Sequence, residues 1–309
     1  MIQDNQLVTG KVLRVTRKTY DVSIGTEVIP CVIRGKLTLE NHGYCSVRAG
    51  DNVRVVMISD TEGVIQEILP RKSLLSRVIE SREYKEHIIA ANIDQIMIIS
   101  STHKPRFASG LLDRYLIIAE KNRLSVLICI NKIDLANKKD FEIYINEYSK
   151  LGYSAFFSSA VNGEGVDRIR EILTDKVTLF VGHSGVGKSS LIHAVQPEDE
   201  VEIQQISSST NKGLHTTSFV QLFGLSFGGF VGDTPGVREL GLWDILKTDL
   251  KSYYVEFHQY IKDCRFVDCQ HINEPGCAVK RAVESGAIFQ ERYRNYLNIY
   301  SSLKSAPYE

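Results

Sequence analysis

The sequence predicts an α/β protein with a small β-rich domain before its main sheet and a helical domain after it. Short β-rich runs fill the first seventy residues, and buried-type strands then alternate with helical stretches. After about residue 243, helical patterns return around a cluster of cysteines and a histidine. Alternating strands and helices indicate a parallel sheet covered by helices. We therefore expect three domains, which comprise residues 1–70, 71–243 and 244–309.

The composition is that of an ordinary folded protein. The chain has 309 residues, and its 37 basic and 37 acidic side chains give no reason to expect nucleic acid or a membrane as partner. The 43% of hydrophobic residues is enough to build buried cores. Apolar runs such as 96–99 and 126–130 are far too short to span a bilayer, and the first residues contain no signal peptide. We expect a cytoplasmic protein that does not bind membranes.

The first domain is predicted to be a small barrel. Its five β-rich runs are Gly10–Val15, Asp21–Ile24, Val28–Ile33, Asn52–Ile58 and Gly63–Ile68. Five short strands separated by turn residues fit an OB-type barrel, and a small sandwich is the alternative. The next segment, Pro70–Arg77, is predicted to be a linker because a proline stands at its start.

The second domain carries the alternating pattern. Strands are expected at Gln95–Ser100, Ser125–Asn131, Ala155–Ser158 and Val177–Gly182, and helices at Leu111–Asn122, Phe141–Leu151 and Val166–Leu173. A β-hairpin is expected from Thr217–Phe223 and Gly229–Gly232. In the third domain, helices are predicted at Asp244–Phe257 and Glu291–Leu303.

A glycine-rich loop joins the last predicted strand of this series to a helix. It matches the pattern G-x-x-x-x-G-K-S in Gly182, His183, Ser184, Gly185, Val186, Gly187, Lys188 and Ser189, with Ser190 following. Backbone N–H groups in such a loop close around phosphate oxygens, and the helix start adds partial positive charge. Lys188 would reach the β- and γ-phosphates, and the Ser189 hydroxyl would bind Mg²⁺. The alternative is a glycine-rich turn that binds no nucleotide.

A second loop is predicted to select the base. It consists of Asn131, Lys132, Ile133 and Asp134, directly after an apolar strand. The Asp134 carboxylate can accept hydrogen bonds from the N1–H and the amine of guanine, whereas adenine would leave it unpaired. Asn131 would brace the loop and face N7, and the stem of Lys132 would pack on the base. Alone, the pattern also fits an ordinary turn at a strand end.

A third loop, with Ser158, Ser159 and Ala160, follows the next β-rich run. A small residue at this place lets a backbone N–H approach guanine O6. Because any strand end could carry such residues, the pattern gains its value from its order in the chain.

Two further segments are predicted to bind Mg²⁺ and to sense the γ-phosphate. Asp233 ends a β-rich run and can hold a Mg²⁺-bound water, and the N–H of Gly236 can bond the γ-phosphate. Residues 207–217 form a polar loop in which Thr217 is the candidate Mg²⁺ ligand. A Pro-Gly turn without a ligand is the alternative for the first segment.

The residue that orients the attacking water is predicted to come from this polar loop. Many GTPases place a glutamine just after the glycine of the DxxG motif. This chain has Val237 there, so His215 is the nearest candidate. The alternative is a solvated loop histidine.

Three cysteines and a histidine cluster near the C-terminus, at Cys264, Cys269, His271 and Cys277. Three thiolates and an imidazole suit a closed structural Zn²⁺ site that has no open position for chemistry. In a reducing cytosol such a cluster suggests a metal rather than disulfides, although reduced cysteines in a helical domain are the alternative. The other cysteines, Cys31, Cys45 and Cys129, are expected in the core.

The order of the motifs is unusual, because the guanine loop precedes the phosphate loop and Asp233–Gly236 comes last. Such an order is that of a circularly permuted GTPase domain. With the barrel and the metal cluster, the chain closely resembles the ribosome small-subunit-dependent GTPase A family (RsgA) over nearly its whole length. The resemblance includes segments 91–95 and 112–115 and the GxHTT element 213–217.

The resemblance implies a circularly permuted P-loop GTPase domain with an N-terminal OB-type barrel and a C-terminal helical zinc-binding domain. It implies a late assembly factor that binds GTP, GDP, the small ribosomal subunit and its rRNA. Such a factor hydrolyses GTP slowly alone and faster on the subunit, and it leaves after hydrolysis. The resemblance implies that His215 has the hydrolytic role and that Thr217 binds Mg²⁺. It also implies that Cys264, Cys269, His271 and Cys277 bind one structural Zn²⁺. One departure is Leu214, where we expect arginine in many relatives.

The expectation of RNA contact rests mainly on this resemblance. An OB-type barrel can bind RNA through a charged groove and stacking aromatics. The candidate residues are Lys11, Arg14, Arg17, Lys18 and Tyr20 in the barrel, Arg71, Lys72, Arg77 and Arg82 at the linker, and Lys280 and Arg281 after the metal cluster. Solvated surface charge is the alternative for each of them.

Two other functions remain open. The chain could be a GTPase switch that acts on protein effectors, or a non-enzymatic RNA-binding protein for which nucleotide is a structural ligand. Acceleration of GTP hydrolysis by small subunits separates the ribosomal function from the first. Nucleotide-independent RNA binding in a Lys188→Ala variant would favour the second. A monomer is expected in each case.

Overall fold

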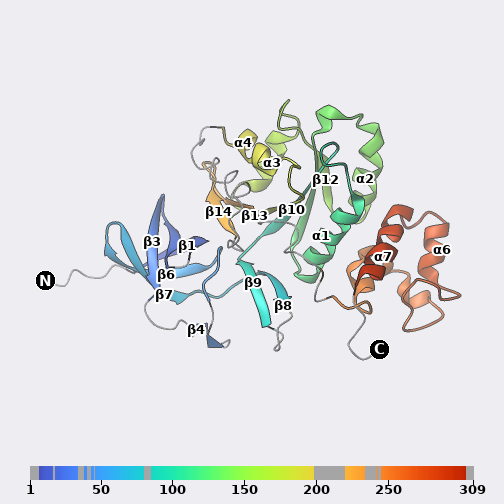
Figure 1. Cartoon of the computed structure of the whole chain (residues 1–309), viewed down its shortest axis with the longest axis horizontal. Coiled ribbons are helices and arrows are strands. Elements are labelled where there is room, and N and C mark those ends of the chain that lie inside the picture. Colours follow the sequence, from blue (N-terminus) through green and yellow to red (C-terminus); the bar gives the residue numbers. More distant parts are fainter. Residues whose placement is uncertain are drawn as a thin grey trace.

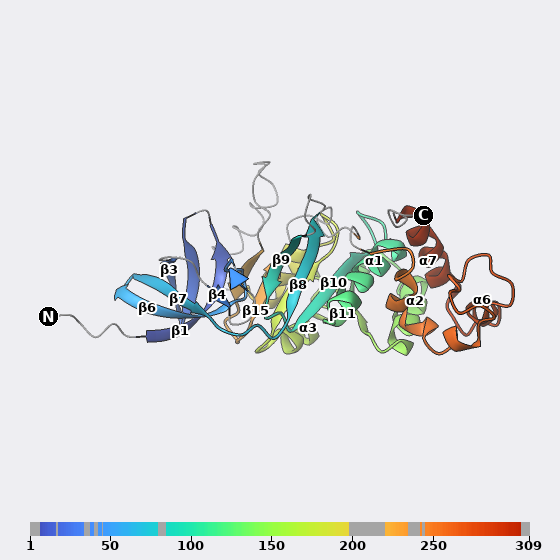
Figure 2. The same ribbon diagram turned by 90° about the horizontal axis from the view of Figure 1, so that it is seen from below.

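Three parts follow one another along the longest axis of the molecule (Figures 1 and 2). A β-barrel lies at one end, a sheet flanked by helices in the middle and a helical part at the other end. The computed structural model describes residues 7–16, 18–33, 38–39, 43–44, 46–79, 85–197, 220–233, 242 and 245–303.

The N-terminal part is a closed barrel in the strand order β1-β2-β3-β7-β6. The strands are β1 Leu7–Val15, β2 Tyr20–Ile24, β3 Glu27–Ile33, β6 Asn52–Ser59 and β7 Glu62–Ile68, and a short pair is formed by β4 Thr38–Leu39 and β5 Gly43–Tyr44. Alternate side chains such as Val12, Val22 and Val53 point inward and are fully buried. The five predicted strands are confirmed, and closure of the sheet excludes the sandwich.

The predicted linker is wrong over its second half. Leu74–Ile79 forms strand β8, which pairs antiparallel with β9 Lys85–Ala91. Leu75 is fully buried in the main core, and Arg71 forms an ion pair with Asp51 of the barrel. The first residues of the segment are polar, as expected of a linker. The strand that follows is stabilised by contacts of its apolar residues with residues that are distant in sequence.

The main sheet has six strands in the order β12-β11-β10-β13-β15-β14. The strands are β10 Gln95–Ser101, β11 Ser125–Asn131, β12 Ser154–Phe157, β13 Val177–Val181, β14 Gln221–Gly224 and β15 Phe230–Asp233. All neighbours are parallel except β14 and β15, which form the predicted hairpin. This arrangement confirms the predicted α/β class.

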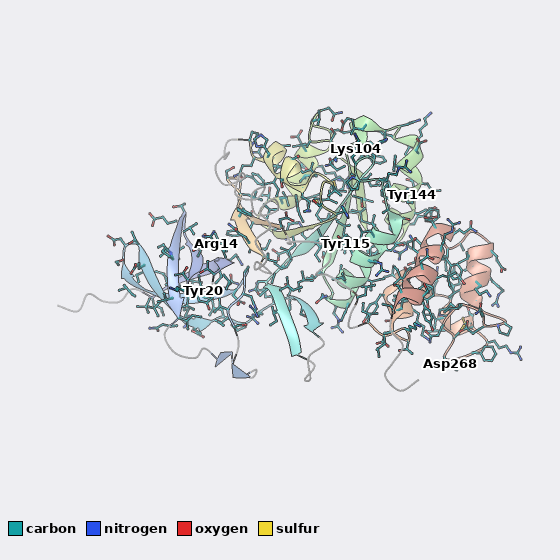
Figure 3. All side chains as sticks on the ribbon, in the orientation of Figure 1. Arg14, Tyr20, Lys104, Tyr115, Tyr144 and Asp268 are labelled. Atoms are coloured by element: carbon teal, nitrogen blue, oxygen red, sulfur yellow. The ribbon has the colours of Figure 1, made fainter. Side chains whose placement is uncertain are left out.

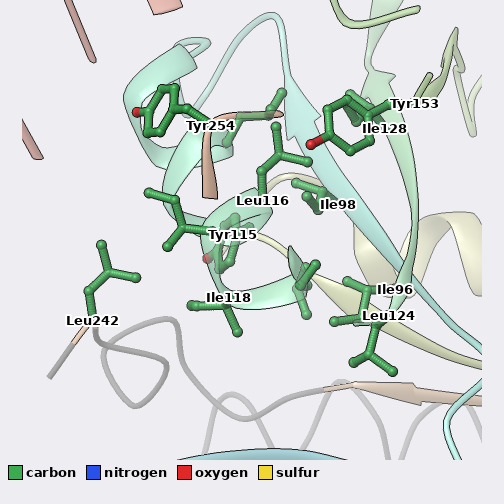
Figure 4. Packing of buried hydrophobic residues seen from close by; sticks show 14 of the residues in the cluster. Ile96, Ile98, Tyr115, Leu116, Ile118, Leu124, Ile128, Tyr153, Leu242 and Tyr254 are labelled. Carbon is green, nitrogen blue, oxygen red and sulfur yellow. The ribbon is translucent and has the colours of Figure 1, made fainter. Parts of the chain in front are cut away.

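Helices cover both faces of this sheet. They are α1 Ser109–Lys121, α2 Lys139–Lys150, α3 Val166–Leu173 and α4 Lys188–Val195. Alternate residues of β10 enter different clusters: Ile96 and Ile98 join the one with α1 and α2, and Met97 and Ile99 join the one with α3 and α4. Figure 4 shows part of the first cluster, including Ile98 and Leu116. None of the helices in the described part of the chain has both the length and the apolar character that a membrane span requires.

The C-terminal part is built from short helical pieces. It contains the 3₁₀ turns η3 Leu250–Tyr253, η4 Val255–Phe257 and η5 Ile261–Asp263 and the helices α6 Ala278–Glu284 and α7 Gln290–Ser302. Helix α7 was predicted, but the single helix expected over residues 244–257 is wrong within the described residues. Aromatic and β-branched residues there favour an α-helix weakly, and 3₁₀ spacing places Tyr254 and Phe257 on one buried side.

Candidate functional site

The predicted nucleotide-binding loops gather at one edge of the main sheet. Strands β10, β11, β12, β13 and β15 run parallel, so their carboxyl ends lie at the same edge. The guanine loop continues from β11, the third loop from β12 and the phosphate loop from β13. In open parallel sheets, ligands bind at this edge.

The backbone of the phosphate loop depends on its glycines. Gly185 and Gly187 have φ angles of +83° and +100°, a region that L-residues with a side chain avoid. A Cβ atom on Gly187 would collide with the side-chain amide of Asn131, and one on Gly182 with the carbonyl of Ile99. The loop is therefore packed against both the guanine loop and strand β10.

Lys188 is the first residue of α4, and its ammonium is held at the base of the phosphate loop. Its Nζ donates to the carbonyl of Gly182 at 3.1 Å and lies 3.8 Å from Oδ1 of Asp233. The two side chains are only 10% and 11% exposed. The structure thus brings together the two charged residues that were expected on the phosphates and on Mg²⁺. Of the neighbouring loop residues, Ser189 is half-buried, and His183, Ser184 and Ser190 are exposed.

Asn131 and Lys132 connect the guanine loop to the phosphate loop. The buried amide of Asn131 donates from Nδ2 to the carbonyl of Val186 at 2.9 Å. Lys132 Nζ donates to the carbonyls of Gly185 and Lys104, at 2.6 Å each. Both side chains therefore brace the two loops against each other, as was expected of Asn131.

The Asp134 carboxylate lies at the exposed rim of this edge. The Ser159 hydroxyl donates to its Oδ1 at 2.5 Å, and that hydroxyl also accepts the N–H groups of Val161 and Asn162. Ile133 anchors the loop, because it is buried and its N–H donates to the carbonyl of Ser158. The guanine loop and the Ser159–Ala160 loop are thus joined directly.

Two residues that sequence reasoning missed also belong to this edge. The Thr102 hydroxyl donates to the carbonyl of Lys132 at 2.6 Å, and the carbonyl of Lys104 accepts from the ammonium of Lys132. Both follow β10, the strand between β11 and β13. Their position after a parallel strand was a usable signal, although no motif marked them. The calls on His215, Thr217 and Gly236, with the neighbouring Leu214 and Val237, lie outside the described residues.

A second site lies in the C-terminal part. The ligand atoms of Cys264, Cys269, His271 and Cys277 all lie within 4.8 Å of one another. Nδ1 of His271 is 3.6 Å from Sγ of Cys264 and 3.4 Å from Sγ of Cys277, and these two sulfurs are 4.0 Å apart. Ligands around one tetrahedral ion with ordinary bond lengths are separated by about 3.5–3.8 Å. The four side chains therefore fit a single tetrahedral metal ion.

The surrounding loop is fixed by hydrogen bonds to its backbone. The Glu274 carboxylate accepts the N–H groups of Gln270 and Ile272 at 2.7 and 2.8 Å. Burial alone would raise the pKa of Glu274, but these backbone donors outweigh it and lower the pKa. The Tyr293 hydroxyl donates to the carbonyl of His271 at 2.7 Å. The ligand-bearing loop is thus tied to α7.

Burial also acts on the ligands themselves. It raises the pKa of Cys269 to about 12 and lowers the pKa of His271 to about 4. The imidazole is therefore neutral and able to bind a cation at neutral pH. A thiolate at this depth needs a cation as partner, because burial penalises the charged form.

Comparison with known proteins identifies the family. The family model for the RsgA GTPase matches residues 68–243. A protein of Chlorobaculum parvum named small ribosomal subunit biogenesis GTPase RsgA is 42% identical over 308 residues, which cover 97% of this chain and 99% of that protein. The chain belongs to the RsgA GTPase family.

Solved structures agree with this membership. The crystal structure of YjeQ from Thermotoga maritima has a TM-score of 0.76 and 34% identity, and the match covers 96% of this chain and 98% of that one. YloQ, described as a circularly permuted GTPase, has a TM-score of 0.72 and 29% identity over 97% of this chain and 96% of that one. The expected circularly permuted GTPase fold is confirmed, and as an RsgA GTPase the protein is an enzyme of GTP hydrolysis.

Several basic residues considered for RNA contact are engaged within this RsgA chain. Arg14 is ion-paired with Asp21 at 2.6 Å, and Arg71 with Asp51 at 2.7 Å. Lys11 donates to the side chain of Asn52, and burial lowers the pKa of its ammonium. Lys18 is exposed and Tyr20 half-buried; Figure 3 labels Arg14 and Tyr20 on the barrel. Arg17 and Arg82 lie outside the described residues.

Proposed function

We propose that this protein is a GTP hydrolase that acts as a late assembly factor of the small ribosomal subunit. The subunit would accelerate GTP turnover, and the protein would leave after hydrolysis. One support is the pair of hydrogen bonds that join the guanine and phosphate loops. The other is the match, over nearly the whole length of both chains, to a relative named small ribosomal subunit biogenesis GTPase RsgA. Its place of action would be the cytoplasm, as a monomer.

The nucleotide would bind across the three loops at the sheet edge. Guanine would meet Asp134, with Asn131, Lys132, Ile133, Ser159 and Ala160 forming the surrounding loops. The phosphates would lie in the loop Gly182–Ser190 with Lys188 on the β- and γ-phosphates. The observation that carries this assignment is the hydrogen bond from Lys132 to the carbonyl of Gly185, since with the bond from Asn131 to Val186 it joins the proposed base-selecting and phosphate-binding segments into one site.

Hydrolysis would require Mg²⁺ beside the γ-phosphate. Ser189 and Thr217 would be its protein ligands, Asp233 would hold a metal-bound water and Gly236 would bond the γ-phosphate. His215 would orient the attacking water. The short distance between Lys188 and Asp233 supports a shared phosphate and Mg²⁺ site.

The metal in the C-terminal part would be one structural Zn²⁺ on Cys264, Cys269, His271 and Cys277. Three sulfurs and a nitrogen at these separations favour Zn²⁺, which accepts them without an open position. The OB-type barrel and this zinc module would contact rRNA on either side of the GTPase domain, because they lie at opposite ends of the molecule (Figure 1).

GTP turnover with and without purified small ribosomal subunits tests the proposal. We expect acceleration by small subunits, none by large subunits, and loss of turnover in Lys188→Ala. Equal rates with and without subunits would favour the alternative, a GTPase switch that acts on protein effectors.

A further inference from the structure

A buried polar joint holds the zinc module against the GTPase domain. Arg292 of α7 is 1% exposed. Its Nη1 donates to Oδ1 of Asp113 in α1 at 2.6 Å, and its Nε and Nη2 donate to the two oxygens of Glu256 at 2.7 and 2.9 Å. Asp113 belongs to the segment 112–115 that the family resemblance includes and that nucleotide binding does not explain. One guanidinium thus connects two parts of the molecule.

The geometry of this joint is tightly specified. The other donors to the Asp113 carboxylate are the hydroxyl of Tyr148 and the amide of Asn295, each at 2.7 Å. Charged groups taken out of water must keep their partners, because an unpaired buried charge is costly. Bidentate guanidinium–carboxylate pairs also restrict orientation more than apolar contacts do. Helix α7 therefore cannot slide or rotate on α1 without breaking several buried bonds.

The segment 101–109 begins at the nucleotide site and ends at this joint. At its far end, the Ser109 hydroxyl donates to Oε1 of Glu291 at 2.9 Å and accepts from Asn295 at 3.1 Å. The ring of Phe107 packs 4.5 Å from that of Tyr144, which in turn contacts Phe289 at 5.9 Å. Figure 3 shows Tyr144 on the side of the GTPase domain that faces the zinc module.

At its near end, the same segment is bonded to the guanine loop and lies against the phosphate loop. The carbonyl of Lys104 and that of Gly185 accept from the same Lys132 ammonium, and Pro105 lies against Gly185. The Ser101 hydroxyl closes the segment on itself by donating to the carbonyl of Pro105 at 2.8 Å. A displacement of the segment would change how the phosphate loop is held.

We propose that Asp113 and Arg292 are positioning residues for nucleotide binding. They lock the zinc module to α1, and segment 101–109 carries that constraint to Lys132 and the phosphate loop. The zinc module is then part of the nucleotide site's support, although it touches no nucleotide. Because coupling between two sites is reciprocal, nucleotide binding also tightens the joint by the same factor.

Nucleotide titration of two matched variants tests this proposal. Arg292→Lys keeps the charge but loses the fork that bonds two carboxylates. Arg54→Lys, the control, alters an exposed pair with Glu67 in the barrel, away from the joint. We expect the dissociation constant for GTP to rise at least about fivefold in the first variant and to stay unchanged in the second. An unchanged constant in an Arg292→Lys protein that retains its zinc would overturn the proposal.

A second variant and a second readout separate positioning from general destabilisation. Ser109→Ala removes two hydrogen bonds without leaving a buried charge, and we expect it to weaken GTP binding in the same direction. In the wild type, a non-hydrolysable GTP analogue should slow amide hydrogen exchange in α7. In Arg292→Lys and in Ser109→Ala, the analogue should slow amide hydrogen exchange in α7 less than in the wild type. If α7 exchange in the wild type does not respond to the analogue, or responds equally in Ser109→Ala, the coupling does not exist. Both measurements are made without ribosomes, so they stand apart from the test of subunit stimulation.

Discussion

At the scale of single residues, the contacts of Asp134 show how the carboxylate that we propose selects the base is oriented. The Ser159 hydroxyl donates to one carboxylate oxygen and is itself fixed by two backbone N–H groups. The orientation matters because selection of guanine over adenine requires hydrogen bonds to both guanine donors, the N1–H and the amine. A misplaced carboxylate would accept only one of these bonds.

Asp134→Asn should weaken guanine-nucleotide binding by roughly 10²- to 10⁴-fold, since two hydrogen bonds to a charged acceptor are lost or weakened. Titration with fluorescent GDP measures the effect. Asp140→Asn, an exposed change in the first turn of α2, is the control and should bind normally. Retained affinity in Asp134→Asn would remove this residue from base recognition.

Two glycines with positive φ allow a matched test of the phosphate loop. Gly187→Ala introduces backbone strain and a collision with Asn131, whereas Gly152→Ala introduces similar strain at φ +91° with open space around it. Both should lose about 1–2 kcal/mol of stability from the strain. Only Gly187→Ala should lose GTP affinity, by at least about tenfold or 1.4 kcal/mol. Parallel losses of affinity would show that the loop geometry is not the cause.

The local patterns around these residues were predictable from the sequence. The motif 182–189 specifies its own backbone, and its glycines have the conformations that the motif requires. The contacts of Thr102 and Lys104 were not predictable from spacing, because they depend on β10 lying between β11 and β13 in the sheet. Such neighbours follow from strand order, which a motif does not encode.

At the scale of elements, the cluster of Cys264, Cys269, His271 and Cys277 connects pieces that are too short to be stable alone. Three 3₁₀ turns and the seven-residue α6 surround the cluster. Isolated helices of this length are marginal in water, so tertiary contacts must hold them, and the proposed Zn²⁺ would add its bonds to these contacts.

Cys277→Ala should therefore abolish zinc binding and unfold the module around it. Metal analysis and limited proteolysis measure the two effects. Cys31→Ala, which changes a buried cysteine of the barrel, should keep one zinc per chain. Full zinc content in Cys277→Ala would contradict the assigned ligand set.

Element prediction succeeded where residues alternate regularly and failed where contacts override the local pattern. Val166–Leu173 was predicted with both ends correct, because its apolar residues recur at helical spacing. Strand β8 was missed because its pairing with β9 is not visible in the polar residues that precede it. The 3₁₀ turns were missed because burial of Tyr254 and Phe257, rather than helix propensity, determines their course.

At the scale of the whole molecule, Arg71 and Asp51 hold the barrel to the segment that leads into the sheet. The pair is buried, with side chains 7% and 0% exposed, and the Arg71 guanidinium is bidentate. Asn92, which follows β9, adds a hydrogen bond from its amide to the carbonyl of Gly50 at 3.0 Å.

Arg71→Met should lower the free energy of unfolding by about 3–5 kcal/mol, because it leaves Asp51 buried without its counter-ion. Arg54→Met removes an exposed pair with Glu67 and should cost less than about 1 kcal/mol. Denaturant titration of both variants compares them. Equal small losses would mean that the Arg71 pair contributes little to this junction.

The strand order also has a consequence for synthesis of the chain. β10 lies at the centre of the sheet, but its partner β13 is translated about 75 residues later, which at cellular elongation rates is several seconds. During that time the nascent sheet has an open edge at β10, whose residues 96–99 are all apolar, and open edges favour wrong pairing. The phosphate loop follows β13, so nucleotide binding cannot stabilise the domain before β13 and this loop have been translated. Until β13 is translated, α1 and β11 cover β10, and rapid translation of β13 limits how long the other edge of β10 stays open.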